Sequence, residues 1–259
     1  MYKIETHDSS PEFFKMWQAA GQHLNNQVDG GIKSWFKAEP TPPWLEHLSF
    51  RLGNQLFFVK VTDVDGTVEL PGNDDGHKIA ARKSGGRACL MPMKKSFIGG
   101  EWMPAFDRWG LRDTFTGDEF NPIEFITDAN IEISDWELND IAVQVVRTRI
   151  EQDDYRLMSW ASNPDLDPAI WFVGASGGPE WVVIRAVRYP MKSARQPENL
   201  TDIAAHASSL SKTGHFASVM VASADDQFDP LAVENGNFSP IYRGHAVMIS
   251  YVGLVPVTS

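Results

Sequence analysis

The chain has 259 residues, of which 42% are hydrophobic and 22% are charged, and its formal net charge at pH 7 is −11. This composition is typical of a soluble globular protein, and the length suffices for one large domain or two modest ones. No apolar run approaches the roughly 18–20 residues that cross a bilayer, and the first residues lack the pattern of a secretory signal. The single cysteine, Cys89, cannot form an internal disulfide, which favours a cytoplasmic protein with Cys89 as a small buried residue.

The first half of the chain predicts one helix followed by strands. In residues 11–27, apolar side chains recur at helical spacing after Ser9 or Ser10 as a cap, with Pro11 at an early helical position and Glu12 completing a capping box with Ser9. From residue 48 the period changes to that of strands, with a hairpin turn at Gly53-Asn54. We predict a polar loop at 73–87 and a short strand at 89–93. Asp63 and Asp65 lack the spacing of a calcium loop, so no metal is expected there.

Acidic residues concentrate in one segment, 97–140. This segment contains two bases, Arg108 and Arg112, and eleven acids: Glu101, Asp107, Asp113, Asp118, Glu119, Glu124, Asp128, Glu132, Asp135, Glu137 and Asp140. The segment therefore carries −9 of the total charge of −11. It is either a solvated surface that keeps the protein soluble or a docking face for a basic partner. Because such a surface repels a phosphate backbone, nucleic acid is not expected as a partner.

The same segment is rich in aromatic residues without a sustained period. Trp102, Phe106, Trp109 and Phe115 either cover the edge of a core or form a binding surface. Aromatic side chains anchor protein interfaces, and charges steer the encounter of the partners. The residues predicted to bind a partner are Trp102, Trp109, Asp113, Asp118 and Glu119.

A capped helix marks the start of the second half, because Ser134 or Asp135 is a suitable N-cap and Glu137 lies in the first turn. We therefore predict two domains, 1–133 and 134–259. The expected elements of the second are a helix at 136–153, strands at 155–162, 169–175 and 180–189, a helix at 198–212, and strands at 214–224 and 245–254. The fold class is α+β, with an N-terminal helix and β-rich subdomain followed by a mixed-sheet domain. No internal repeat of long period is evident.

The α-β-β-β-α-β order of the second half resembles the restriction-endonuclease-like core, whose signature is Pro-Asp followed by (Asp/Glu)-x-Lys. The resemblance covers about 110 residues and lies in element order. It implies two carboxylates that bind a divalent metal and a lysine that orients water. In "NPDLDP", Asp165 and Asp167 stand near the first acid, whereas Val183 and Arg185 occupy the acid and lysine positions. Glu180 comes too early, so the motif is degenerate.

Arg185 is expected to lie in a buried central strand and to pair with a carboxylate of Asp165, Asp167 or Glu198. Its alternative role is in an altered active site. Two other polar residues, His215 and His245, begin strands and are expected to face each other. They would form a hydrogen-bonded pair or, with Asp225 and Asp226, a metal site.

Two functions follow as hypotheses. The favoured one is a non-catalytic cytoplasmic protein, without cofactor or metal, that holds a basic protein partner through the acidic, aromatic segment. This profile is similar to that of bacterial immunity proteins that neutralise basic toxins. The alternative is a divergent metal-dependent nuclease that uses Asp165, Asp167, Glu180 and Arg185. A nuclease site requires these carboxylates within about 4–5 Å of one another in an open cleft.

Overall fold

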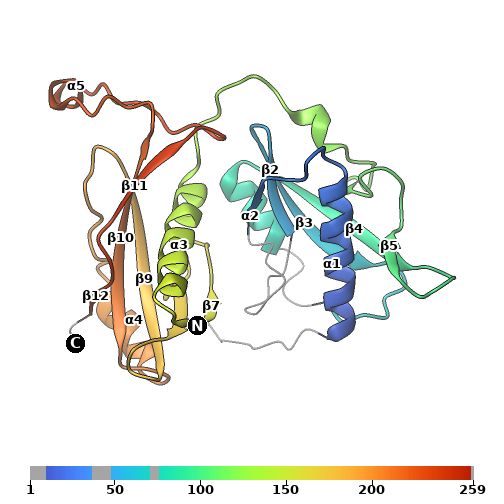
Figure 1. Cartoon of the computed structure of the whole chain (residues 1–259), viewed down its shortest axis with the longest axis horizontal. Coiled ribbons are helices and arrows are strands. Elements are labelled where there is room, and N and C mark those ends of the chain that lie inside the picture. The colour runs from blue at the N-terminus through green and yellow to red at the C-terminus, as the bar shows by residue number, and fades with distance from the viewer. Residues whose placement is uncertain (1–9, 37–47, 71–75, 258–259) are drawn as a thin grey trace. The chain divides into compact units, whose positions relative to one another are not determined.

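The structure, a computed structural model, describes residues 10–36, 48–70 and 76–257. The chain divides into two compact units, an N-terminal unit that ends at Asn130 and a C-terminal unit that begins at Ile131. Each unit contains helices and a six-stranded mixed sheet (Figure 1). The α+β fold predicted from the sequence, with an N-terminal helix followed by a β-rich region, is confirmed. The predicted boundary at 133/134 lies at the start of the helix that opens the C-terminal unit.

The N-terminal unit builds its sheet in the order β1-β2-β3-β4-β5, and β6 also pairs with β4. Strands β3 and β4 are parallel, and all other neighbours are antiparallel. Its elements are α1 (Pro11–Asn26), β1 (Ser34–Phe36), β2 (Leu48–Leu52), β3 (Gln55–Asp63), α2 (Gly76–Ser84), β4 (Arg87–Lys95), β5 (Trp102–Pro104), β6 (Arg112–Asp113) and the 3-10 helix η1 (Pro122–Phe125).

Helix α1 forms where its cap and apolar spacing predict. The side chain of Ser10 accepts a hydrogen bond from the Phe13 N–H at 3.1 Å, and Pro11 occupies the first turn. The predicted capping box with Ser9 lies outside the described residues. The apolar face of α1 packs on the sheet and forms one core with side chains of β3 and β4, including Phe57, Val59 and Met91.

The predicted polar loop at 73–87 is wrong for residues 76–84, which form α2; residues 71–75 lie outside the described part. Helix α2 packs on β3 and β4 with small side chains, among them Ala80, Ala81 and Ser84. Such a helix leaves almost no apolar periodicity to read in the sequence. The parallel pairing of β3 and β4 explains why it is there, because a parallel pair needs a long crossover connection.

The C-terminal unit builds its sheet in the order β11-β10-β9-β8-β7, and β12 also pairs with β10. Strands β9 and β10 are parallel, and the other neighbours are antiparallel. Its elements are α3 (Asp135–Gln152), β7 (Arg156–Trp160), β8 (Ile170–Val173), β9 (Pro179–Arg188), α4 (Leu200–Ala207), β10 (Gly214–Ser223), α5 (Pro230–Glu234), β11 (Val247–Tyr251) and β12 (Val255–Pro256).

The two helices α3 and α4 cover different residues of β9. Helix α3 begins at a full capping box, in which the Ser134 N–H donates to the Glu137 carboxylate and the Glu137 N–H donates to the Ser134 hydroxyl. It packs on β7, β8, β9 and β10. Helix α4 packs with Trp181 and Val183, which alternate along β9 with Glu180 and Val182. Side chains of β9 therefore divide between an α3 face and an α4 face.

The two units share one topology, which the sequence did not reveal as a repeat. Each has a helix, three strands joined by antiparallel pairing, a second helix, and a fourth strand parallel to the third. In both units, two short strands pair antiparallel with the fourth strand. The short strand that comes first in the sequence pairs near the end of the fourth strand, and the second pairs nearer its start. The repeat lies in strand pairing and burial rather than in residue identity, which is why no sequence period appears.

A glycine at the start of the fourth strand of each unit allows the residues of the two sheets to be matched one by one. Gly214 begins β10 opposite Trp181, and Gly86 precedes Arg87, which lies opposite Phe57. Matching these glycines superimposes the burial patterns of residues 88–93 and 216–221 position by position. In this match, Lys60 of β3 is equivalent to Arg185 of β9, Gln55 to Glu180, and Arg87 to His215.

Cys89 is expected to be unreactive in the folded protein. It lies in the middle of β4 with no exposed surface, and burial raises the pKa of its thiol far above the usual range. Since the thiolate is the nucleophile, a maleimide should label Cys89 only after denaturation. Mass spectrometry of native and urea-treated protein measures this, and stoichiometric labelling under native conditions would contradict the burial.

Candidate functional sites

The aromatic residues of the acidic segment divide between core and surface. Trp102 and Trp109 are buried; Trp109 stacks on Phe50 with ring centroids 6.3 Å apart, and the Trp102 Nε1–H donates to Glu12. Burial excludes both indoles as exposed anchors for a partner. Of the four aromatic residues considered in the sequence, the exposed ones are instead Phe106 and Phe115. The sequence alone could not separate these pairs because the segment has no period from which to assign faces.

Residues 105–120 form two adjacent turns, which we call the acidic loop. The first turn closes with the Gly110 N–H donating to the Asp107 carbonyl, and the second closes with the Gly117 N–H donating to the Asp113 carbonyl. A bridge between Arg112 and Glu119 joins the strands of the loop. The carboxylate of half-buried Asp113 accepts hydrogen bonds from the N–H groups of Phe115 and Thr116, so this predicted site residue holds its own turn.

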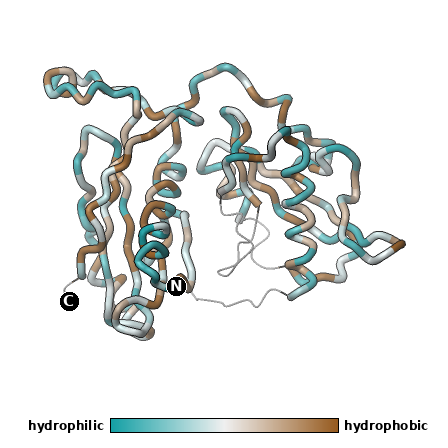
Figure 2. The backbone as a smooth tube through the Cα atoms, viewed as in Figure 1, coloured by the Kyte–Doolittle hydropathy of each residue, from teal (hydrophilic) through white to brown (hydrophobic). Residues whose placement is uncertain are grey.

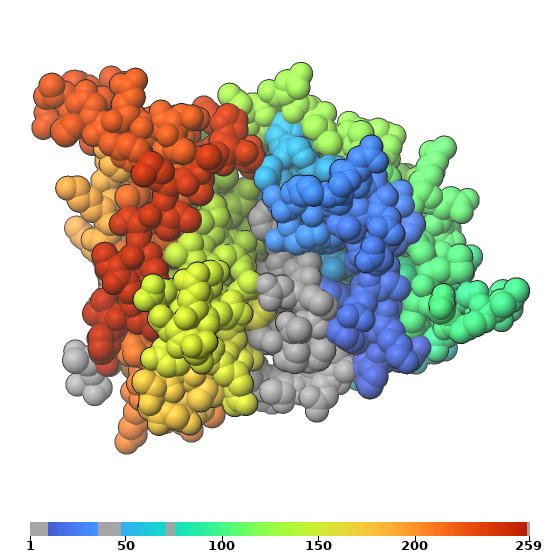
Figure 3. Space-filling model, viewed as in Figure 1, coloured from blue at the N-terminus to red at the C-terminus, as the bar shows by residue number. Residues whose placement is uncertain are grey.

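The two arginines of the acidic loop already have partners. Arg108 pairs with Glu119 at 3.2 Å, and the guanidinium of Arg112 lies 3.7 Å above the ring of Phe106. Asp107, Asp118 and Glu119 are exposed. Figure 3 shows the segment from about residue 95 to 130, in green, as an outer surface of the N-terminal unit. The projecting β4–β5 turn within it is strongly hydrophobic in Figure 2, and it contains the exposed side chains of Phe97 and Ile98.

Not all eleven acids of segment 97–140 contribute to a surface. Glu137 and Asp140 are buried in α3, and Glu137 forms an ion pair with Arg243 at 2.9 Å. Asp135 pairs with Arg188. Glu132, also in the C-terminal unit, is exposed and lies 3.9 Å from Arg188. The other exposed acids of the segment lie between Glu101 and Asp128, within the N-terminal unit.

The residues of the nuclease alternative lie in different places. Asp167 and Arg185 form a two-pronged ion pair, with one Nη1–Oδ1 distance of 2.9 Å, and the Arg185 Nη1 also donates to the Ile184 carbonyl. Asp165 is exposed in the loop before β8. Glu180 points to the other face of β9, where it contacts His215. Among the described residues, no group of three or more His, Cys, Asp or Glu side chains is placed to hold a metal.

The expected pairing of His215 with His245 is wrong. His215 lies near the start of β10 and contacts Glu180, whereas His245 precedes β11, whose residue Val247 pairs with Ser223 near the end of β10. The Nδ1 of His245 lies 3.7 Å from Asp225. The antiparallel register therefore places the two histidines at opposite ends of β10.

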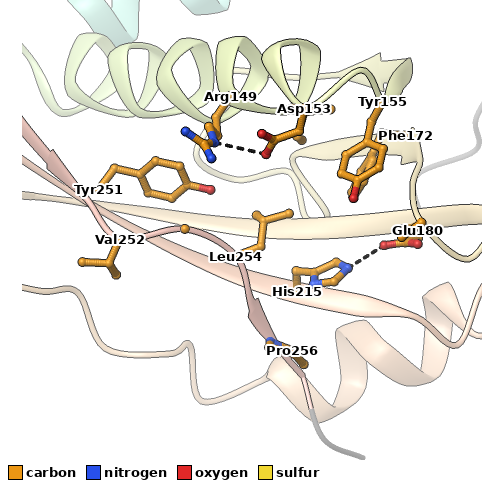
Figure 4. A pocket seen from close by; sticks show the side chains of 13 residues that line it. Arg149, Asp153, Tyr155, Phe172, Glu180, His215, Tyr251, Val252, Leu254 and Pro256 are labelled. Carbon is orange, nitrogen blue, oxygen red and sulfur yellow. Dashed lines mark hydrogen bonds and ion pairs between the residues drawn. The ribbon is translucent and has the colours of Figure 1, made fainter.

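The C-terminal unit contains a pocket of about 450 Å³ on the α3 face of its sheet. Figure 4 shows its side chains coming from the end of α3, from β8 to β10, and from the segment that joins β11 to β12. The polar groups are Glu180, His215, Tyr251, Tyr155 and the pair of Arg149 with Asp153, whose Nε and Oδ2 are 3.1 Å apart. Phe172 packs between Tyr155 and His215, with ring centroids 5.8 and 5.9 Å away.

Glu180 and His215 form the floor of this pocket. Their Oε2 and Nε2 atoms are 2.7 Å apart, and the side chains are only 7% and 15% exposed. Burial alone would raise the pKa of Glu180, but hydrogen bonds from Ser176 and His215 outweigh it and hold that pKa below its usual value. Glu180 is therefore ionised and only accepts hydrogen bonds, so Nε2 of His215 carries the proton.

Local sequence explains how Glu180 reaches this position. Gly174 ends β8 beside it, and a Cβ on Gly174 would lie 2.5 Å from the Glu180 carboxyl carbon. The turn at 174–177 presents the Ser176 N–H, which donates to Glu180 at 3.0 Å. In the sequence "GASGGPE", the small residue Gly174 opposite an acid is the one signal that this carboxylate turns inward.

Two buried polar atoms in the pocket have no hydrogen-bond partner among the described residues: the Nδ1 of His215 and the hydroxyl of Tyr251. Burial raises the pKa of Tyr251 to about 12, against the opposing effect of Arg149 and with a contribution from Asp153. The phenol is therefore neutral at pH 7. Buried polar atoms usually have partners, so a water molecule or a ligand in the pocket would satisfy these two.

Comparison with known proteins adds one match. A family described as a domain of unknown function (DUF8840) matches residues 136–257, which lie within the C-terminal unit. No curated protein and no solved structure matches the chain. Within the described residues, no helix has the length and apolar character needed to span a membrane.

Proposed function

We propose that this is a non-catalytic, cytoplasmic binding protein that holds a basic protein partner through the acidic loop and its neighbouring surface, as an immunity protein holds a toxin. The observation that supports this most directly is the exposure of Phe106 and Phe115 among the exposed carboxylates of Asp107, Asp118 and Glu119. Large apolar side chains anchor interfaces, and the surrounding charge selects and steers a partner of opposite sign.

The charge of the loop favours a cationic partner specifically. Arg108 and Arg112 are engaged by Glu119 and Phe106, so neither projects alone toward a partner. The nuclease alternative has less support, because the Asp167 carboxylate is taken up by Arg185 and Glu180 lies on the other face of β9. Val183, at the expected ligand position, is a buried core residue.

The test is a comparison of two charge-reversed variants as baits. The variant Asp118→Lys/Glu119→Lys with Phe115→Ser should lose basic proteins that the wild type retains from lysate of the source organism. Asp113 is left unchanged because it holds its own turn. A matched control, Asp202→Lys/Glu234→Lys, reverses two exposed acids of the C-terminal unit.

Retained proteins are identified by mass spectrometry and then bound in purified form. For a partner held by this surface, the association rate should fall as salt rises, because the Debye length shortens to about 8 Å at physiological ionic strength. If the loop variant and the control retain the same proteins, or if the lost proteins are acidic, the proposal is wrong.

A further inference from the structure

We propose that the pocket of the C-terminal unit binds a small planar organic cation with N–H donors, of the amidinium or protonated amino-heterocycle class. This site is separate from the acidic loop, and it is an additional function of the chain. Its argument rests on three features of the pocket: a carboxylate at its floor, unpartnered acceptors in its wall, and aromatic side chains around it.

The charge of the pocket selects a cation. Glu180 is ionised, and its partner His215 is a hydrogen-bond donor through Nε2. At the rim, the positive charge of Arg149 is matched by Asp153, the C-cap residue of α3. The Arg149–Asp153 pair is neutral as a whole, so Glu180 provides the negative charge of the pocket. An anionic ligand would be repelled by Glu180 at the floor.

The available hydrogen-bonding atoms select N–H donors. The imidazole of His215 with its one proton on Nε2 presents Nδ1 as an acceptor. The Tyr251 hydroxyl also has a lone pair to offer, and in Figure 4 it points toward the middle of the group of labelled side chains. Both atoms are buried without a partner among the described residues. A ligand that donates several hydrogen bonds satisfies them.

The walls select a flat ligand. Tyr155, Phe172 and Tyr251 line the pocket with aromatic rings, and a cation gains from contact with such rings. A volume of about 450 Å³ lies within the usual range for small-molecule sites, roughly 300–1,000 Å³. Leu254 and Pro256 complete an apolar side, so a planar cation has both a ring surface and a charged floor to contact.

The N-terminal unit provides an internal comparison. At the positions that match Glu180 and His215, it has Gln55 and Arg87, and the guanidinium of Arg87 lies 3.8 Å above the Phe125 ring. The same topology therefore forms without an acid–histidine pair. The strand order therefore does not require the pair of Glu180 and His215.

Benzamidine serves as the probe, and isothermal titration calorimetry on the full chain measures its binding. Benzoate, with the same ring and opposite charge, should not bind. Glu180→Gln keeps one acceptor oxygen for the Ser176 N–H and removes the charge, and it should weaken benzamidine binding about tenfold or more. Tyr251→Phe keeps the ring and should weaken binding roughly threefold to tenfold.

Asp167→Asn is the matched control, since it also neutralises a carboxylate beside the same sheet but on the α4 face, where Asp167 contacts Arg185. Its affinity for benzamidine should equal that of the wild type. Thermal melting verifies that each variant is folded. If benzamidine does not bind at millimolar concentration, if benzoate binds equally well, or if Tyr251→Phe and Asp167→Asn have the same affinity, the proposal is wrong. None of these outcomes depends on the acidic loop.

Discussion

Replacing Arg243 by methionine should destabilise the C-terminal unit by about 3–5 kcal/mol, more than the same replacement of Arg185. Both arginines pair with a carboxylate through two nitrogens. They differ in exposure: the Arg243 and Glu137 side chains are 3% and 5% exposed, whereas those of Arg185 and Asp167 are 28% and 13% exposed.

Exposure decides the difference in stability between the two variants, because the loss of free energy comes from the carboxylate that is left without its partner. Without Arg243, Glu137 must remain charged in the interior or take up a proton. Without Arg185, water reaches Asp167 more easily, so the expected loss is roughly 1–3 kcal/mol. The free energy of opening, measured by hydrogen exchange of β9 and β10 amides, reports the C-terminal unit alone.

A double variant separates the buried charge from the lost contacts. Glu137→Gln/Arg243→Met removes both charges while glutamine retains the capping box with Ser134. It should therefore be more stable than Arg243→Met alone. An Arg243→Met protein as stable as the Arg185→Met protein, or a double variant no better than the single one, would disprove this account.

The ion pair of Arg185 shows how far sequence patterns reach. The sequence predicts that Arg185 pairs with Asp165, Asp167 or Glu198, and the structure selects Asp167. The predicted burial of Arg185 was too high. The strand is apolar on both faces, yet the Arg185 side chain is partly exposed. Periodicity predicts which face a side chain takes but does not give the distance from that face to solvent.

The pair of Glu180 and His215 could not be predicted in the same way. From the sequence, Glu180 is interpreted only as a nuclease acid that comes too early, and His215 as a partner of His245 in a hydrogen-bonded pair or a metal site. Their contact depends on the parallel register of β9 and β10, in which His215 lies opposite Val182. A parallel register is set by the crossover through α4 and by side-chain packing, and neither leaves a local mark in the sequence.

The burial of Trp102 and Trp109 has a similar cause. Composition placed them in an acidic, irregular segment, where exposed anchors were expected. The structure turns them toward α1 and β2, where Trp102 reaches Glu12 and Trp109 reaches Phe50. These contacts join residues far apart in the chain, so they follow from the fold and cannot be inferred from neighbouring residues.

Replacing Gly214 by alanine should destabilise the C-terminal unit by about 3 kcal/mol, near the upper end for overpacking a core. A Cβ at this position would lie 2.0 Å from the Trp181 ring, which is fully buried and donates its Nε1–H to the Ser211 carbonyl at 3.2 Å. The ring cannot move aside without losing that hydrogen bond and its packing against α4.

The topological match extends this prediction to the N-terminal unit. Gly86→Ala would place a Cβ 2.7 Å from the Phe58 ring and 3.1 Å from the Leu56 carbonyl oxygen. It should also destabilise its unit, by roughly 1–3 kcal/mol. The control is Gly178→Ala in the β8–β9 turn, whose Cβ would approach only the Ser176 hydroxyl, at 4.0 Å.

A second substitution tests whether steric overlap is the cause. If the Cβ of residue 214 collides with the Trp181 ring, Trp181→Leu makes room for it, and the two changes together should cost less than the sum of their separate effects. Such coupling between contacting residues is commonly about 0.5–3 kcal/mol. Hydrogen exchange of β10 amides in the four proteins of this cycle measures the coupling. Strict additivity would show that Gly214 is required for a reason other than the close approach of Trp181.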